Sequence, residues 1–181
     1  MLYIMRHGRT DWNDLHKLQG RTDIPLNEEG RNAAVEAGKA CNINFDVCYT
    51  SPLSRARETA ELFFKGRNVP ILTDDRLVEM CFGKYEGLAD SFKIKDCPIN
   101  LLFWDPEKYA AEENAETLEQ LFERTGEFLE QVAMPLVREG KNVLIVGHGA
   151  MNCSIVCRVK NIPLKNFWDC GIDNCKLMEL L

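Results

Sequence analysis

Short runs of apolar residues alternate along this chain with longer amphipathic segments. The run "LYIMR" (2–6) is continuous, which predicts a strand buried on both faces. "FDVCYTS" (45–51) predicts a second strand, and "NVLIVGHG" (142–149) carries the clearest strand pattern of the chain. Weaker patterns indicate a short strand within residues 69–80 and a strand over residues 175–181 that closes the sheet.

Two amphipathic segments in the first third of the chain predict helices. Residues 26–41 form the first, with Asn27 as N-cap and two glutamates in the first turn, where the helix dipole favours negative charge. Residues 51–64 form the second. Ser51 is expected to be its N-cap and Pro52 its first helical residue.

The second half of the chain predicts two further helices. Thr117 and Gln120 have the spacing of a capping box, which predicts a helix over residues 118–132. Residues 150–159 predict a helix directly after the clearest strand. Residues 81–115, by contrast, contain scattered glycine and proline and are expected to form an irregular excursion.

The alternation of strands and helices predicts the fold class. It indicates an α/β protein, a three-layer α/β/α sandwich with a mainly parallel central sheet. We expect a single domain over residues 1–181, with a small cap at about residues 81–115. In such sheets, ligands bind at the carboxyl ends of the strands.

Two of the three histidines lie at such strand ends. His7 and His148 each follow an apolar strand, and each is followed by a glycine, Gly8 or Gly149, that allows a ligand to approach the backbone closely. His16 lies in a polar loop and is interpreted as a surface residue.

Arginines lie close to the same strand ends. Arg6 precedes His7, while Arg55 and Arg57 lie near the start of the helix predicted after the second strand. Residues two apart on a helix point in different directions, so only one of these two arginines is expected to face the strand ends. Guanidinium groups bind phosphate bidentately, so the pattern predicts an anion site, best suited to phosphate.

Composition narrows the classes of function. The chain has 181 residues, 45% of them hydrophobic, and a net charge of −6. The negative charge argues against nucleic acid or an anionic membrane as partner, and no apolar run approaches the roughly eighteen residues of a membrane span. We expect a cytoplasmic protein, with its oligomeric state left open. The negative charge does not argue against a small cationic pocket within an acidic body.

The eight cysteines lack the spacing of a zinc site or a disulfide framework. Cys153 and Cys157 are four residues apart on a predicted helix, and Cys170 and Cys175 are five apart. We interpret them as reduced thiols. Cys81, two residues after Glu79, could be a reactive thiol near the pocket, although an inert half-buried one is favoured.

The anion site suggests phosphoryl transfer. A neutral imidazole can act as the nucleophile, and a carboxylic acid must then protonate the leaving oxygen. Spacing alone does not decide which of the 28 carboxylates has this role.

Five blocks of sequence together resemble one known family, the histidine phosphatase superfamily of phosphoglycerate-mutase-like enzymes. They occur in the family's order between residues 2 and about 155 and read "RHGRTDWN", "LQGRTDIPLNEEG", "TSPLSRARETA", "LVEMCFGKYEG" and "VGHGAMN". Each block alone is a weak signal, but five in order are a strong one.

The resemblance implies a role for each matching residue. His7 would be the nucleophile that carries the phosphoryl group, and Glu79 the acid that protonates the leaving oxygen and later activates water. Arg6, Arg55 and His148 would complete the phosphate pocket, which selects Arg55 over Arg57. No metal and no dissociable cofactor are implied.

Further positions are implied to contact phosphate or substrate. These are Asn13, the backbone near Gln19 and Gly20, and Thr10, which matches the phosphatase branch of the family. Phe82 replaces a tyrosine of the mutases, which removes a hydroxyl that could bind substrate. The aromatic residues of the excursion (Phe92, Phe103, Trp104 and Tyr109) are expected to pack a small cap rather than to hold substrate.

The resemblance leaves three functions open. The favoured one is a metal-independent phosphomonoesterase for a small phosphorylated metabolite, since the segment after Cys81 is shorter than the insertion with which mutases enclose their substrate. A 2,3-bisphosphoglycerate-dependent phosphoglycerate mutase is the first alternative. A binding module without turnover is the second, and the presence of both His7 and Glu79 argues against it.

Overall fold

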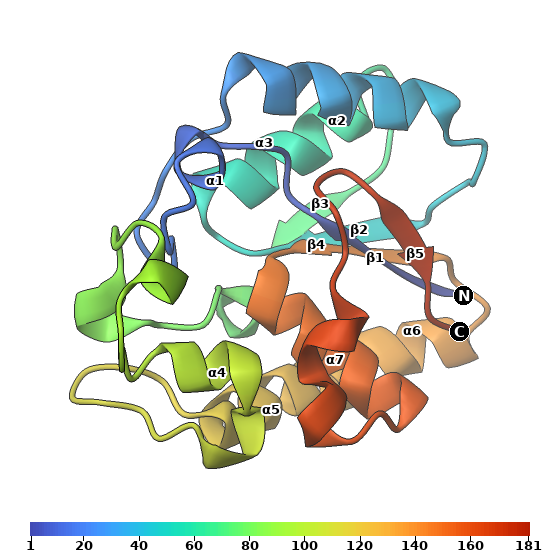
Figure 1. Cartoon of the computed structure of the whole chain (residues 1–181). Coiled ribbons are helices and arrows are strands. Elements are labelled where there is room, and N and C mark those ends of the chain that lie inside the picture. Colours follow the sequence, from blue (N-terminus) through green and yellow to red (C-terminus); the bar gives the residue numbers. More distant parts are fainter.

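The computed structural model describes residues 1–181, and a five-stranded sheet lies at its centre (Figure 1). The strand order is β3-β2-β4-β1-β5. β1 to β4 run parallel, and β5 pairs antiparallel with β1. The strands are β1 (Leu2–Arg6), β2 (Val47–Thr50), β3 (Ile71–Thr73), β4 (Val143–Gly147) and β5 (Leu177–Glu179).

The register of the two central strands places His7 and His148 side by side. β1 and β4 pair from Leu2 opposite Val143 to Arg6 opposite Gly147, so the next residue of each chain segment is a histidine. β4 is buried along its whole length, as expected for a parallel strand covered on both faces. The strand predictions are confirmed.

Helices cover both faces of the sheet, which confirms the three-layer α/β/α sandwich (Figure 1). One face carries α2 (Glu28–Ala40) and α3 (Ser54–Phe63), and the other carries α5 (Leu118–Phe128) and α7 (Gly149–Lys160). α5 continues through a π-helical turn, Leu129–Ala133, into α6 (Met134–Arg138), so the helical segment runs past the predicted end at residue 132.

The predicted caps have mixed outcomes. Asn27 caps α2, and Thr117 with Gln120 forms the expected capping box of α5. The prediction for α3 is wrong, because Ser51 is not its N-cap and the helix begins at Ser54. Ser51 instead accepts a hydrogen bond from Leu53 N in the preceding turn, at 3.2 Å. A residue outside the helix binds an N–H group in the first turn of α3: Ser54 N donates to Asp23 Oδ1 at 2.9 Å.

Short helical turns account for the rest of the chain. α1 (Asp11–Asp14) follows β1, and α4 (Asn100–Trp104) lies in the segment predicted to be an excursion. The 3-10 turns are η1 (Asp75–Leu77), η2 (Gly83–Tyr85), η3 (Ser91–Lys93), η4 (Pro106–Lys108) and η6 (Leu164–Cys170). None of the helices combines the length and the apolar character needed to cross a membrane.

Candidate active site

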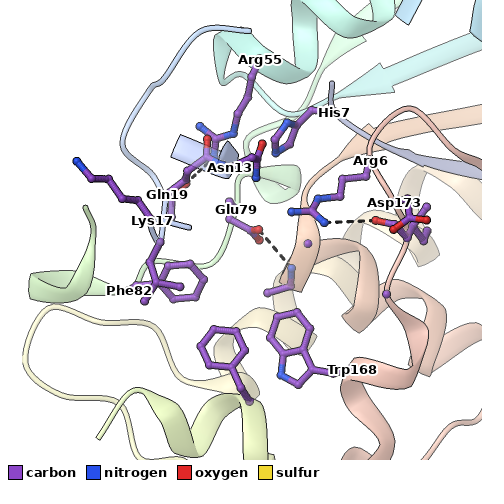
Figure 2. Close-up of a pocket in the computed structure, with 17 residues that line it drawn as sticks. Arg6, His7, Asn13, Lys17, Gln19, Arg55, Glu79, Phe82, Trp168 and Asp173 are labelled. Carbon is purple, nitrogen blue, oxygen red and sulfur yellow. Dashed lines mark hydrogen bonds between the residues drawn. The ribbon is translucent and has the colours of Figure 1, made fainter. Parts of the chain in front are cut away.

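A cavity of about 320 Å³ opens at the carboxyl ends of the parallel strands (Figure 2). It is lined by residues that follow β1, by the start of α7, and by parts of the segments around residues 79–103 and 168–173. The lining includes nine residues singled out in the sequence: Arg6, His7, Asn13, Gln19, Gly20, Arg55, Glu79, Phe82 and Gly149.

The His7 ring is held in one tautomer. Its Nδ1 lies 2.6 Å from the carbonyl oxygen of Gly8 and must donate to it, because a carbonyl can only accept. Nε2 therefore carries the free lone pair. Burial, followed by the nearby Arg55 and Arg6, holds the pKa of His7 well below 6.5, so the ring is neutral near pH 7.

His148 lies beside His7 and does not itself line the cavity. The two ring centroids are 5.2 Å apart, and His148 is completely buried. Burial first, and then Arg55 and His7, hold the pKa of His148 well below its ordinary value. Neither ring nitrogen has a hydrogen-bond partner, which is unusual for a buried polar group and suits a ligand that supplies one.

Arg55 is held at the start of α3 with its side chain entirely buried. Its Nη1 donates to Thr22 O at 2.9 Å and its Nη2 to Gly20 O at 2.7 Å, while Nε has no partner. Arg57, two residues later, is exposed, as expected for the other side of the helix.

Arg6 approaches the cavity from the end of β1 (Figure 2). Its Nη1 donates to Ile172 O at 3.5 Å, and its buried Nε has no partner. Arg6, Arg55 and His148 therefore lie close to His7, and each of the three has a buried nitrogen without a hydrogen-bond partner. An anion with several oxygens, such as phosphate, would satisfy these groups together.

Glu79 also lines the cavity, and both its carboxylate and the Arg6 guanidinium lie close to Gly149. Its carboxylate accepts hydrogen bonds from Ala150 N at 3.2 Å and Met151 N at 2.9 Å, at the start of α7. The N–H of Met80 adds a third, at 2.8 Å. Gly149 lies close by, where a Cβ would be 3.6 Å from Glu79 Oε2. The carboxyl is therefore fixed by backbone donors and by a helix N-terminus, which stabilise negative charge.

Thr10 orients two amides of the cavity wall without lining the cavity itself. Its hydroxyl donates to Gln19 Oε1 at 2.9 Å, and its N–H donates to Asn13 Oδ1 at 3.1 Å. With both carbonyl oxygens engaged, the NH₂ groups of Asn13 and Gln19 remain available as donors to a ligand.

The loop beneath Arg55 is shaped by Gly20 and Glu86. Gly20 has a φ of +55°, which side chains rarely adopt, and a Cβ there would press against the Glu86 carboxylate, so this position favours glycine. Glu86 accepts the N–H groups of Arg21 at 3.0 Å and Thr22 at 2.9 Å. This carboxylate therefore places the carbonyls that hold Arg55.

Several lining residues were not predicted from the sequence. Phe103 and Trp168 stack with centroids 5.0 Å apart, and both line the cavity, so Phe103 is not merely cap packing. Lys17 and Asp173 bring charge to the wall of the cavity. No local motif marks these residues, because they reach the cavity from separate segments of the chain: Phe103 lies in α4 and Trp168 in η6. The structure shows no group of three or more His, Cys, Asp or Glu side chains suited to a metal ion.

The family profile described as the histidine phosphatase superfamily (branch 1) matches residues 2–181. The chain belongs to this superfamily. The match extends beyond the motif blocks to the last strand, so it includes the Trp168 and Asp173 region of the cavity.

Curated relatives within this superfamily include phosphatases and mutases. The uncharacterized phosphatase PhoE of Bacillus subtilis is 39% identical over 81% of this chain and 70% of its own length. Phosphoserine phosphatase 1 of Hydrogenobacter thermophilus is 28% identical over 96% of this chain and 82% of its own. A 2,3-bisphosphoglycerate-dependent phosphoglycerate mutase of Parvibaculum lavamentivorans is 32% identical over 90% and 80%.

Solved structures of superfamily members share the fold. YhfR of Bacillus stearothermophilus superposes with a TM-score of 0.85 at 33% identity, over 97% of this chain and 88% of that one. A phosphoserine phosphatase of Entamoeba histolytica, in complex with 3-phosphoglyceric acid, gives a TM-score of 0.83 at 25% identity over 97% and 87%. The protein is thus a phosphatase-type enzyme of this superfamily.

Proposed function

We propose that this enzyme hydrolyses a small phosphomonoester through a phosphohistidine on His7. One observation carries the proposal: a neutral His7, with its Nε2 lone pair free, lies close to Arg6, Arg55 and His148, and each of these three residues has a buried nitrogen without a partner. These nitrogens are suited to donate hydrogen bonds to the non-bridging oxygens of a phosphoryl group, and the lone pair of His7 Nε2 is suited to attack the phosphorus.

In the first half-reaction, His7 Nε2 forms a bond to phosphorus as the ester P–O bond breaks. The leaving oxygen takes a proton from the Glu79 carboxyl. The N–H groups of Ala150 and Met151 then stabilise the carboxylate that is left behind. Arg6 and Arg55 stay cationic throughout and stabilise the charge on the transferring group.

In the second half-reaction, water attacks the phosphohistidine. Glu79 accepts a proton from this water, the P–N bond breaks, and inorganic phosphate leaves with His7 neutral again. The same carboxyl therefore acts as acid and then as base, which requires that it start protonated and that it face, in both steps, the oxygen that lies opposite His7.

We further propose a small metabolite as substrate. The cavity volume of about 320 Å³ is at the lower end for small-molecule sites. Beyond Glu79, the apolar surfaces of Phe82, Phe103 and Trp168 would contact the leaving group (Figure 2). Phosphoserine, the substrate in the name of one relative, is a reasonable member of a first panel.

The test is phosphate release from a panel of monoesters without added metal, for the wild type and His7→Ala. The panel contains phosphoserine, α-ribazole 5′-phosphate, a sugar phosphate, and 3-phosphoglycerate with and without 2,3-bisphosphoglycerate. We expect hydrolysis by the wild type, none by the variant, and a phosphohistidine at residue 7 after quenching in base. Isomerisation of 3-phosphoglycerate without hydrolysis would support a mutase instead, and ligand binding without any turnover would support a binding module.

A further inference from the structure

A buried ion pair lies next to the Glu79 segment, outside the cavity. Arg124 of α5 forms two bonds to the carboxylate of Glu116, Nε to Oε1 at 2.6 Å and Nη2 to Oε2 at 2.9 Å. The side chains are 15% and 7% exposed. Neither residue lines the cavity, so neither has a part in the chemistry described above.

This pair binds the backbone on both sides of Glu79. Arg124 Nη1 donates to Val78 O at 2.7 Å and to Arg76 O at 2.6 Å. Glu116 accepts the N–H of Cys81 at 3.3 Å and donates its own N–H to Cys81 O at 2.9 Å. The residue before Glu79 and the second residue after it are therefore anchored to one charged pair.

Arg21 completes the network from the loop beneath Arg55. Its Nε donates to Glu79 O at 3.3 Å, and its Nη2 lies 3.3 Å from Glu116 Oε1. Residues 78–82 belong to no helix or strand, so no regular ladder of backbone hydrogen bonds holds them. Side chains supply the missing partners.

We propose that Arg124 and Glu116 are positioning residues for Glu79. They keep its carboxyl at the distance from the leaving oxygen that proton transfer requires, through the backbone of residues 78–81. A buried ion pair is a poor source of net stability, since an apolar pair of similar volume would serve the core equally well. The guanidinium of Arg124 fixes the geometry of the backbone that it binds, whereas an apolar side chain in its place would not.

This inference rests on the acid role of Glu79 in the proposed function. It predicts that loss of the two-bond contact between Arg124 and Glu116 slows the hydrolysis of an ester most when its leaving group needs a proton. An alkyl phosphate such as phosphoserine needs the acid, because its leaving alkoxide is strongly basic. 2,4-Dinitrophenyl phosphate does not, because its phenolate leaves without a proton.

The experiment measures kcat for both esters in Arg124→Lys, Glu116→Gln and Glu79→Gln. Glu79→Gln serves as the reference and should lower kcat for the alkyl ester by about 10²-fold or more, with little change for the aryl ester. Arg124→Lys and Glu116→Gln should show the same selectivity with a loss of about tenfold. Arg158→Lys is the matched control, since Arg158 also donates to a backbone carbonyl, that of Phe122 in α5, and it should change neither rate.

Each outcome decides the question. Equal slowing of both esters in Arg124→Lys would show a structural role only and would overturn the positioning role. If Glu79→Gln slows both esters equally, the acid role of Glu79 is wrong as well. If Glu79→Gln slows only the alkyl ester while Arg124→Lys and Glu116→Gln show no such selectivity, the acid role stands and the positioning role is wrong. If the buried variants do not fold, Arg21→Ala replaces them, because Arg21 is 44% exposed and contacts Glu79 O directly. A loss confined to the alkyl ester supports positioning of Glu79 by this network, and unchanged rates or equal slowing of both esters contradict it.

Discussion

At the scale of single residues, the site depends on side chains whose partners are backbone groups rather than other side chains. Gly8 O sets the tautomer of His7, and the carbonyls of Gly20 and Thr22 hold Arg55. Backbone groups at these points have little freedom, so the side chains are arranged before a ligand arrives. Such preorganisation is the main source of electrostatic stabilisation of a transition state.

Arg55→Lys should lower kcat/KM by about 10²- to 10³-fold, the usual cost of losing one preorganised donor. Lysine keeps the charge but cannot bind Gly20 O and Thr22 O while donating to phosphate. Steady-state kinetics with one alkyl and one aryl ester measure the loss, and both esters should lose equally. Arg57→Lys, at an exposed position of the same helix, is the control, and a similar loss there would contradict the assignment.

Trp168→Ala should raise KM more than it lowers kcat. Trp168 stacks on Phe103, and its Nε1 donates to Leu102 O at 2.7 Å, so the pair forms a fixed apolar wall. An aromatic contact of this kind contributes about 1 kcal/mol, or roughly fivefold in KM. Kinetics with the best ester of the panel test this. A loss confined to kcat would instead place Trp168 in the chemical step.

At the scale of elements, the packing of α2 on α3 orients the start of α3 toward the cavity. Gly38 of α2 lies against the backbone of Phe63 in α3, where an added Cβ would be 2.1 Å from Phe63 O. The helices can approach this closely only because residue 38 has no side chain. The other end of α3 carries Arg55, so the contact fixes the direction from which that guanidinium reaches the phosphate site.

Gly38→Ala should destabilise the protein by about 1–3 kcal/mol, because the clash is with backbone that cannot move aside alone. Urea unfolding followed by circular dichroism measures the change. Asn32→Ala, at an exposed position of the same helix, is the control and should be neutral or slightly stabilising. Equal stability of the two variants would show that α2 and α3 can separate without cost.

At the scale of the whole molecule, two neutral histidines are buried in the sandwich near its cavity. His7 and His148 both have a pKa held well below 6.5 by burial and by neighbouring arginines. The unfolded chain binds a proton at each of them below pH 6.5, whereas the folded protein does not. The stability they contribute is therefore present above pH 6.5 and is lost as the pH falls toward the folded-state pKa.

In phosphate-free buffer, the free energy of unfolding should decrease as the pH falls below 6.5, by up to about 1.4 kcal/mol per pH unit for each histidine. His148→Gln removes one of these groups, so its profile should be less steep than that of the wild type by that amount. Urea titrations between pH 7.5 and 5 compare the two. Parallel profiles would mean that His148 binds its proton in the folded state as readily as in the unfolded one.

Local patterns predicted the elements whose ends are set by neighbouring residues. The capping box of Thr117 and Gln120 is such a case, because the partners are three residues apart. The predicted start of α3 was wrong for the opposite reason: the N–H of Ser54, in its first turn, donates to Asp23, which is 31 residues away. A cap supplied from a distant loop leaves no trace in the nearby sequence.

The sequence by itself determined the α/β sandwich and the histidines and arginines at its strand ends, because strand periodicity and parallel pairing bring those ends to one edge. The roles of Glu79 and Asn13 came with the family resemblance, and they remain proposals. Only the tertiary structure decided which nitrogens of the site are left without a partner, that Trp168 lines the cavity, and that Arg124 with Glu116 binds the backbone on both sides of Glu79. The physical reason is distance: these contacts join residues that are far apart in the chain, and only packing brings them within hydrogen-bonding range.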